Sequence, residues 1–194
     1  MNAIPYAIER RPDTGVNNVK LGVWLFLAWE GMLFAALFSA YFMLRAGAIT
    51  WGWSPHWELA RANTVLLLGS TGVLSLAMRA ARRQRVTTFR AWMSVSLVLA
   101  TAFLGVKTYE YRDDFALALY PRVSTRIALY YLLTGIHALH VVGGLIVDVW
   151  LIVASGETWR RAAPVMINRV EATTQFWVFV DVIWLILLLL LYVW

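Results

Sequence analysis

Apolar residues along the chain are gathered into five long runs, which short polar segments separate. A helix that crosses the hydrocarbon core of a bilayer needs about 20 mostly apolar residues, at a rise of about 1.5 Å each. The runs meet that length, and they lack the alternating strands of about ten residues that build a membrane barrel. We therefore predict an all-α integral membrane bundle of five transmembrane helices, over residues 21–44, 62–81, 89–106, 128–154 and 172–194. Residues 1–19 are a polar N-terminal segment, and residues 20–194 form a single membrane domain.

The composition supports a membrane protein and excludes several kinds of redox site. Hydrophobic residues make up 61% of the chain and charged residues 14%, against about 45–50% and about 25% in soluble domains. The chain has no cysteine, so it has no disulfide, no iron–sulfur cluster and no thiolate-bound metal.

The basic residues predict the orientation of the bundle. The net charge is +6, but most Lys and Arg lie in the short segments between apolar runs, which is typical of topology signals and lipid headgroup contacts rather than of nucleic-acid binding. Eleven lie on one side and six on the other. The richer side is expected to be cytoplasmic, which places the N-terminus in the cytoplasm and the C-terminus outside. The eleven are Arg10, Arg11, Lys20, Arg79, Arg82, Arg83, Arg85, Arg90, Arg160, Arg161 and Arg169.

Four ionisable residues fall near the middle of predicted spans: Glu30, His137, His140 and Asp181. Charged groups are costly at that depth, so each is a candidate functional residue, either in a buried polar network or in a proton relay. A structural role is the alternative, because a carboxyl that burial keeps protonated can fix helix packing through hydrogen bonds.

The histidines exclude one common membrane cofactor arrangement. A membrane cytochrome b holds haem between histidines on facing helices, whereas His137 and His140 share one predicted helix and His56 lies in a loop. No glycine-rich phosphate loop, nucleophile elbow or HExxH pattern is present. We expect no catalytic residue, no metal site and no redox cofactor in this chain.

Five motifs in order resemble subunit III of the haem–copper respiratory oxidases, over nearly all of residues 20–194. They are the Glu30-bearing segment 20–34, Asn63-Thr64, the segment 103–111, the Thr-Gly-x-His-x-x-His-Val-x-x-Gly segment 134–144, and the Trp-x-Phe-Val-Asp-x-x-Trp segment 177–184. The family commonly has Ser, Gln and His where this chain has Trp29, Lys107 and Val178. A buried network that uses the imidazole of that His must differ here, because Val178 stands in its place.

The resemblance implies an accessory subunit of the five-helix form found in bacterial oxidases, and hence the bacterial plasma membrane. It implies a chain packed against the catalytic subunit I, in a complex with subunit II and other membrane subunits that hold the haem and copper. It further implies bound phospholipid between the helices, and a role in proton uptake and in stability during turnover.

Residues carried over from the family form two groups. Glu30, His137, His140 and Asp181 are expected to be buried polar or proton-linked residues. A second group is expected at lipid or subunit interfaces: Trp24, Arg45, Asn63, Glu110, Tyr111, Glu171 and Trp184.

Three alternatives stay open at this point. One is a related subunit of a nitric oxide reductase, whose partner would carry a haem–iron centre. Another is a proton-linked transporter, although the chain has no internal repeat and no Pro-interrupted span. The third is a pure assembly scaffold. The electron donor, cytochrome c or quinol, is selected on other subunits of an oxidase.

Overall fold

The computed structural model describes residues 6, 8–48 and 56–193, and these residues form helices connected by turns without any strand. In chain order the helices are α1 (Asn18–Ala46), α2 (Trp57–Arg82), α3 (Val86–Ala116), α4 (Thr125–Leu188) and the π-helix η1 (Leu189–Val193). The four α-helices are each long and apolar enough to cross a membrane. The predicted class, an all-α integral membrane bundle, is therefore confirmed.

The helices extend beyond the apolar runs that predicted them. The run 89–106 lies inside α3, which continues to Ala116 and carries Lys107 and Glu110 in its last turns. The run 172–194 lies in α4 and η1 up to Val193, and residue 194 falls outside the described residues. Polar side chains also set helix starts, since Asn17 and Ser124 each accept a hydrogen bond from the backbone N–H three residues later.

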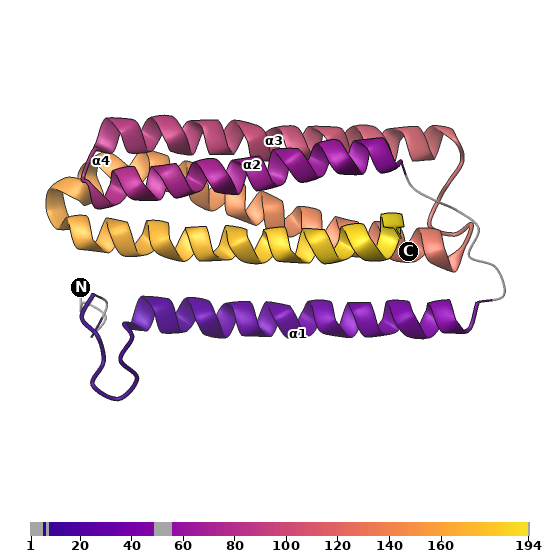
Figure 1. The fold of residues 1–194 in the computed structure, drawn as a ribbon, viewed down its shortest axis with the longest axis horizontal. Helices are drawn as coiled ribbons and strands as arrows, with labels where there is room; N and C mark the ends of the chain where they lie inside the picture. The colour runs from indigo at the N-terminus through magenta and orange to yellow at the C-terminus, as the bar shows by residue number, and fades with distance from the viewer. Residues whose placement is uncertain (1–5, 7, 49–55, 194) are drawn as a thin grey trace.

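Helix α4 turns back on itself partway along its length (Figure 1). Ala162 leaves helical geometry, with φ −160° and ψ 78°, and Pro164 follows, which cannot donate a backbone hydrogen bond. We call residues 125–161 the first limb of α4 and residues 163–188 the second limb. The limbs run antiparallel (Figure 1), and the Trp177 indole N–H of the second donates to Asp148 of the first at 3.1 Å.

Close approach of the two limbs depends on Gly144. A Cβ atom at this position would lie 2.8 Å from the ring of Trp177, closer than packed atoms tolerate. The sequence predicted separate helices over 128–154 and 172–194. The first lies within α4 and the second begins in α4 and continues into η1, since the polar stretch between them is helical as well, apart from Ala162.

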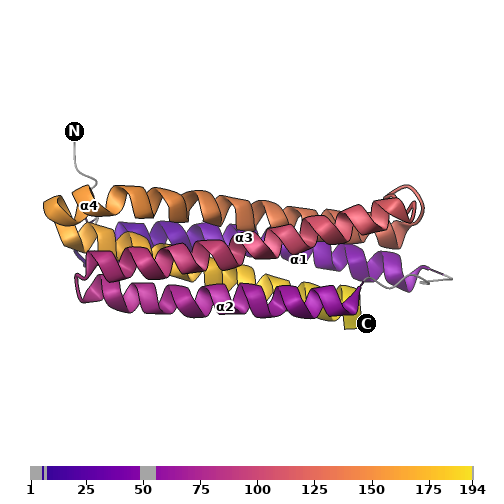
Figure 2. The same ribbon diagram turned by 90° about the horizontal axis from the view of Figure 1, so that it is seen from above.

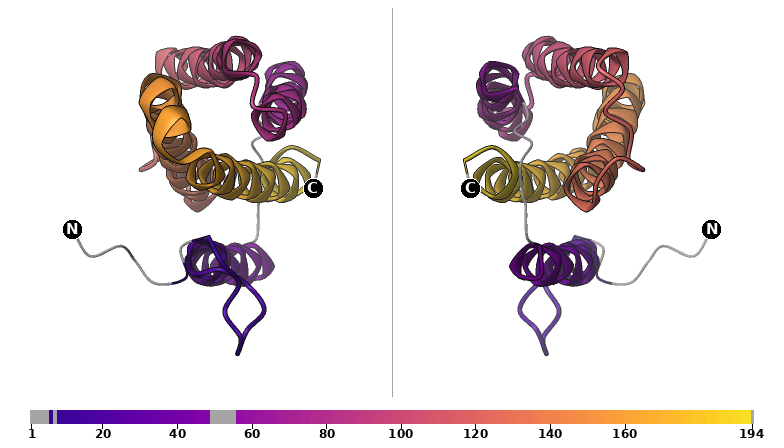
Figure 3. Two further views of the ribbon diagram at one scale, coloured as in Figure 1. Left: turned by 90° about the vertical axis from the view of Figure 1, so that its left-hand side faces the viewer. Right: turned by 90° about the vertical axis from the view of Figure 1, so that its right-hand side faces the viewer.

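The core lies between α2, α3 and the two limbs of α4, which surround it when viewed along the helices (Figure 3). Helix α1 stands outside this group and packs on α4 (Figures 1 and 3), and it runs along the length of the bundle when seen from above (Figure 2). Its buried side chains are Phe34 and Tyr41, and most of its surface is exposed. The start of α1 and the end of η1 lie at opposite ends of the bundle (Figure 1).

One end of the bundle carries most of the positive charge, and we call it the basic end. It holds the start of α1, the α2–α3 turn and the reversal of α4 (Figure 1). Glu171 of α4 pairs there with Lys20 of α1 at 3.1 Å and with Arg82 of α2 at 3.6 Å. This single carboxylate therefore contacts basic residues of two other helices.

Candidate functional site: buried polar groups between the helices

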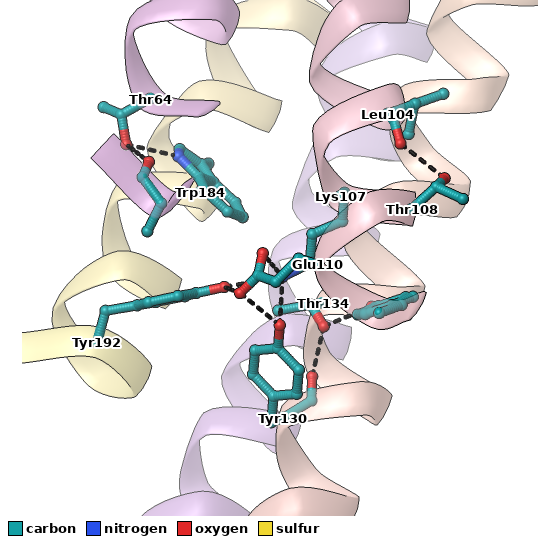
Figure 4. A network of polar contacts seen from close by, with 11 residues as sticks. Thr64, Leu104, Lys107, Thr108, Glu110, Tyr130, Thr134, Trp184 and Tyr192 are labelled. Carbon is teal, nitrogen blue, oxygen red and sulfur yellow. Dashed lines mark hydrogen bonds and ion pairs between the residues drawn. The ribbon is translucent and has the colours of Figure 1, made fainter. Parts of the chain in front are cut away.

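A buried ion pair on α3 lies at the centre of the largest polar cluster drawn in Figure 4. Lys107 and Glu110 are 2% and 0% exposed, and Lys107 Nζ lies 3.0 Å from Glu110 Oε2. Lys107 also donates to the hydroxyl oxygens of Tyr130 and Tyr192, each at 2.8 Å. All three ammonium protons therefore have acceptors.

The same two tyrosines complete the coordination of the carboxylate. Tyr130 and Tyr192 donate their hydroxyl protons to Glu110 Oε1, at 2.7 and 2.9 Å. Desolvating two charges costs several kcal/mol per ion unless such additional hydrogen bonds form. The pair can therefore exist in this interior because aromatic hydroxyl groups from two other segments replace water around both charges.

Three segments bring these groups together. Lys107 and Glu110 are three residues apart and so project from one side of α3. Tyr130 comes from the first limb of α4, and Tyr192 comes from η1. Leu190, also in η1, accepts a hydrogen bond from Tyr41 of α1 at 2.5 Å. The C-terminal turn is therefore attached both to the buried ion pair and to α1.

A second polar contact joins α1 to α4. His140 Nε2 lies 2.9 Å from Glu30 Oε2, and His140 Nδ1 lies 2.8 Å from the carbonyl oxygen of Ile136. A carbonyl only accepts, so Nδ1 carries a proton. The Nε2–carboxylate hydrogen bond then contains one proton, which belongs either to a histidinium facing a carboxylate or to a carboxylic acid facing a neutral imidazole.

His137 and Asp181 are buried away from this contact. The His137 ring packs against Phe103 and Trp184, with centroids 5.8 and 5.4 Å apart, and neither ring nitrogen has a hydrogen-bond partner among the described residues. Asp181 lies beside Thr71 of α2 and is 6% exposed. The structure thus brings Glu30 and His140 together, and it leaves the other two predicted residues in separate surroundings.

Comparison with known proteins decides the family. The sequence model of the protein family described as cytochrome c oxidase subunit III matches residues 12–194. The chain belongs to the cytochrome c oxidase subunit III family. The probable cytochrome c oxidase subunit 3 of Mycobacterium tuberculosis is 31% identical over 180 residues, which cover 91% of this chain and 88% of the relative. The corresponding protein of Thermostichus vulcanus is 32% identical over 199 residues, covering 98% and 92%.

Similar relatives also include a quinol oxidase subunit. The cytochrome bo(3) ubiquinol oxidase subunit 3 of Pseudomonas aeruginosa is 30% identical over 184 residues, covering 93% of this chain and 86% of the relative. The family resemblance that the motifs indicated is confirmed. Membership of the subunit III family makes this chain an accessory component of a complex with other oxidase subunits.

The residues expected at lipid or subunit interfaces of this subunit III differ from one another in exposure, and some are buried within the chain. Trp24 is 49% exposed, and Arg45 lies 3.4 Å from the Tyr41 hydroxyl. Glu171 forms the basic-end contacts given above. The others lie wholly or partly inside the chain: Asn63, Glu110 and Trp184 are fully buried, and Tyr111 is part-buried and bonded to Thr134 at 2.6 Å.

Sequence reasoning missed the role of Lys107 in this subunit III. It identified Lys107 as a departure from the family's Gln, at the end of an apolar run, and as one of the six basic residues on the less basic side. The signal that could have found the cluster was the Lys107–Glu110 spacing of three on one helix face. Tyr192 gave no local signal, because it lies 85 residues along the chain from Lys107.

Among residues 6, 8–48 and 56–193, no group of three His, Asp or Glu side chains converges on a point where a metal ion could bind. The three histidines are also dispersed. His56 pairs with Asp113 at 3.1 Å, His140 with Glu30, and His137 is enclosed by aromatic rings.

Proposed function

We propose that this subunit III is a cofactor-free accessory subunit of a terminal haem–copper oxidase. It packs on the catalytic subunit I, binds phospholipid between its helices, and supports proton uptake and the stability of the enzyme during turnover. The observation that carries the proposal is the Glu30–His140 contact, a one-proton pair whose side chains are 13% and 15% exposed within an apolar helix pair. A proton site at that depth suits a subunit that flanks a proton-consuming enzyme.

We propose that the chain crosses the membrane five times, with each limb of α4 as a separate span. The reversal at Ala162 and the antiparallel Asp148–Trp177 contact support this count. The start of α1 and the end of η1 lie at opposite ends, as an odd number of spans requires. The excess of Lys and Arg at the basic end supports a cytoplasmic N-terminus in the bacterial plasma membrane.

An apolar pocket between α1 and the two limbs of α4 supports lipid binding. It has a volume of about 450 Å³ and lining residues that include Val23, Phe26, Trp150 and Phe176. Arg169 also lines it, with its guanidinium carbon 4.9 Å from the centre of the Trp150 ring. An acyl chain fits the apolar wall, and the arginine at the basic end can contact a headgroup phosphate.

The exposed side of α1 supports contact with other membrane components. Trp29, Met32 and Met43 are 69%, 65% and 77% exposed there. In a membrane, such a face is covered by lipid or by the spans of a partner. We assign part of it to subunit I, the principal partner proposed for this chain.

Removal of this subunit from the purified oxidase tests the proposal. With haem content shown to be equal, the depleted enzyme should keep part of its initial rate, because this chain contains no redox centre. Its rate should fall further at high pH, where proton supply is scarce, and it should inactivate earlier during turnover. Immediate and complete loss of activity with intact haem would refute an accessory role.

A further inference from the structure

A pocket at the α2–α3 turn is lined by three arginines and is separate from the sites described above. It has a volume of about 250 Å³, and its lining includes Arg79 and Arg83 of the end of α2 and Arg85 immediately before α3. None of the three forms an ion pair with a carboxylate in the described part of the chain. Glu171, the nearest acidic partner of α2, pairs with Arg82 instead.

The turn itself brings these cations together. Arg79 lies in the last turn of α2 and Arg83 is the C-cap residue of that helix, four residues later. Gln84, with φ 55°, then reverses the chain between the helices, and Arg85 approaches the same space from the start of α3. Guanidinium groups without protein partners in a concave site are well suited to bind phosphate oxygens, through paired N–H donors.

The remaining lining residues distinguish a lipid from a soluble phosphate. Leu76 lies seven residues before Arg83, and Trp92 lies seven residues after Arg85. At a rise of about 1.5 Å per residue, Leu76 lies about 4 Å deeper along the bundle than Arg79 and about 10 Å deeper than Arg83, and Trp92 lies about 10 Å deeper than Arg85. The pocket is therefore cationic at the end of the helices and apolar toward the middle of the bundle, the polarity of a headgroup joined to an acyl chain. A free phosphate or an acidic peptide would have no use for the apolar part.

We propose that this pocket binds an anionic phospholipid, with its phosphate on Arg79, Arg83 and Arg85 and its glycerol and upper acyl chain against Leu76 and Trp92. Three unpaired cations exceed the single charge of one phosphodiester, so the pocket favours a headgroup with two phosphates. This site is distinct from the pocket at Arg169, because the two share no lining residue.

Photo-crosslinking of the native complex, purified through a tag on this chain, tests the site. The probe is a phosphatidylglycerol carrying a photoreactive group near the headgroup, in phosphatidylcholine vesicles. Labelled peptides are then mapped, and we expect labelling within residues 76–92. Unlabelled tetraoleoyl cardiolipin should compete more strongly than phosphatidylglycerol, and inorganic phosphate should not compete.

Two matched double variants separate the pocket from general surface charge. Arg79→Gln with Arg83→Gln should reduce labelling within 76–92 by about 30-fold, because each basic residue near an anionic surface strengthens binding by about a factor of five. Arg160→Gln with Arg161→Gln removes the same charge at the same end of the bundle and should leave that labelling within about twofold. Copurification of the partner chains verifies that each variant folds.

Three results would overturn the proposal: equal loss in both double variants, full competition by inorganic phosphate, or labelling confined to other segments. The readout is the labelled peptide rather than oxidase activity. A failure of the accessory function therefore leaves this test unaffected, and a failure at this pocket leaves the accessory function unaffected.

Discussion

Replacing Lys107 by Met tests the energetic account of the buried ion pair. The change removes the cation and leaves the Glu110 carboxylate fully buried with two tyrosine hydroxyl donors. Removing one partner of a buried pair costs about 3–5 kcal/mol. The two remaining hydrogen bonds lower this penalty. We therefore expect a loss near the lower bound, about 3 kcal/mol.

The assay is unfolding of the purified subunit by SDS titration in mixed micelles, followed by near-ultraviolet circular dichroism. Lys20→Met is the matched control, since it removes the same group from the partly exposed pair with Glu171. Such pairs contribute about 0–1 kcal/mol. Glu110→Gln should be as damaging as Lys107→Met, because it leaves the ammonium without its counter-charge.

The double variant Lys107→Met with Glu110→Gln contains no buried charge at this position. Its loss should be smaller than the sum of the single losses by about 2–3 kcal/mol. Additive losses, or a loss of under about 1 kcal/mol for Lys107→Met, would refute the reasoning that the two charges stabilise each other in the interior.

Three further predictions concern packing, a buried acid and topology. Gly144→Ala should lower the unfolding free energy by about 1–3 kcal/mol, because the new Cβ atom meets the ring of Trp177. Gly143→Ala is the control in the same SDS titration, and it should be nearly neutral because the space around residue 143 is open. Asp181→Leu should reduce the assembled subunit in membranes more than Asp181→Asn, since only Asn keeps a hydrogen-bonding group beside α2; equal levels would place this residue against water. Reporter fusions at Gly15 and in the segment between the limbs of α4 should lie on one side of the membrane, and a fusion after Trp194 on the other; the same side for all three would disprove five spans.

The helices and the shared depth of Glu30 and His140 could be predicted from the sequence, for physical reasons. Apolar runs of spanning length form helices because the bilayer leaves the backbone no other hydrogen-bond partners. Glu30 and His140 could be matched because distance along a helix gives depth, and the structure brings them within 2.9 Å of each other. Depth alone does not say which neighbour a side chain faces, so His137, only three residues away, could not be separated from that contact.

Only part of the Lys107 cluster could be predicted, because the spacing of Lys107 and Glu110 indicates the pair but its tyrosine partners are remote in the chain. The apolar run ends at residue 106, so Lys107 and Glu110 read as residues beyond the span. They are buried because Tyr130 of the first limb of α4 and Tyr192 of η1 cover them. The two predicted spans required a reversal between them, but the sequence did not show that the polar stretch at this reversal is helical on both sides of Ala162.

Purification of the tagged chain from its native membrane in mild detergent, with identification of the copurifying proteins by mass spectrometry, tests the central proposal most directly. The account predicts a stoichiometric haem–copper catalytic subunit I, together with subunit II. A catalytic partner with a haem–iron centre would instead assign the chain to a nitric oxide reductase. Recovery of the intact chain without any haem-containing partner would contradict an accessory role in a respiratory oxidase.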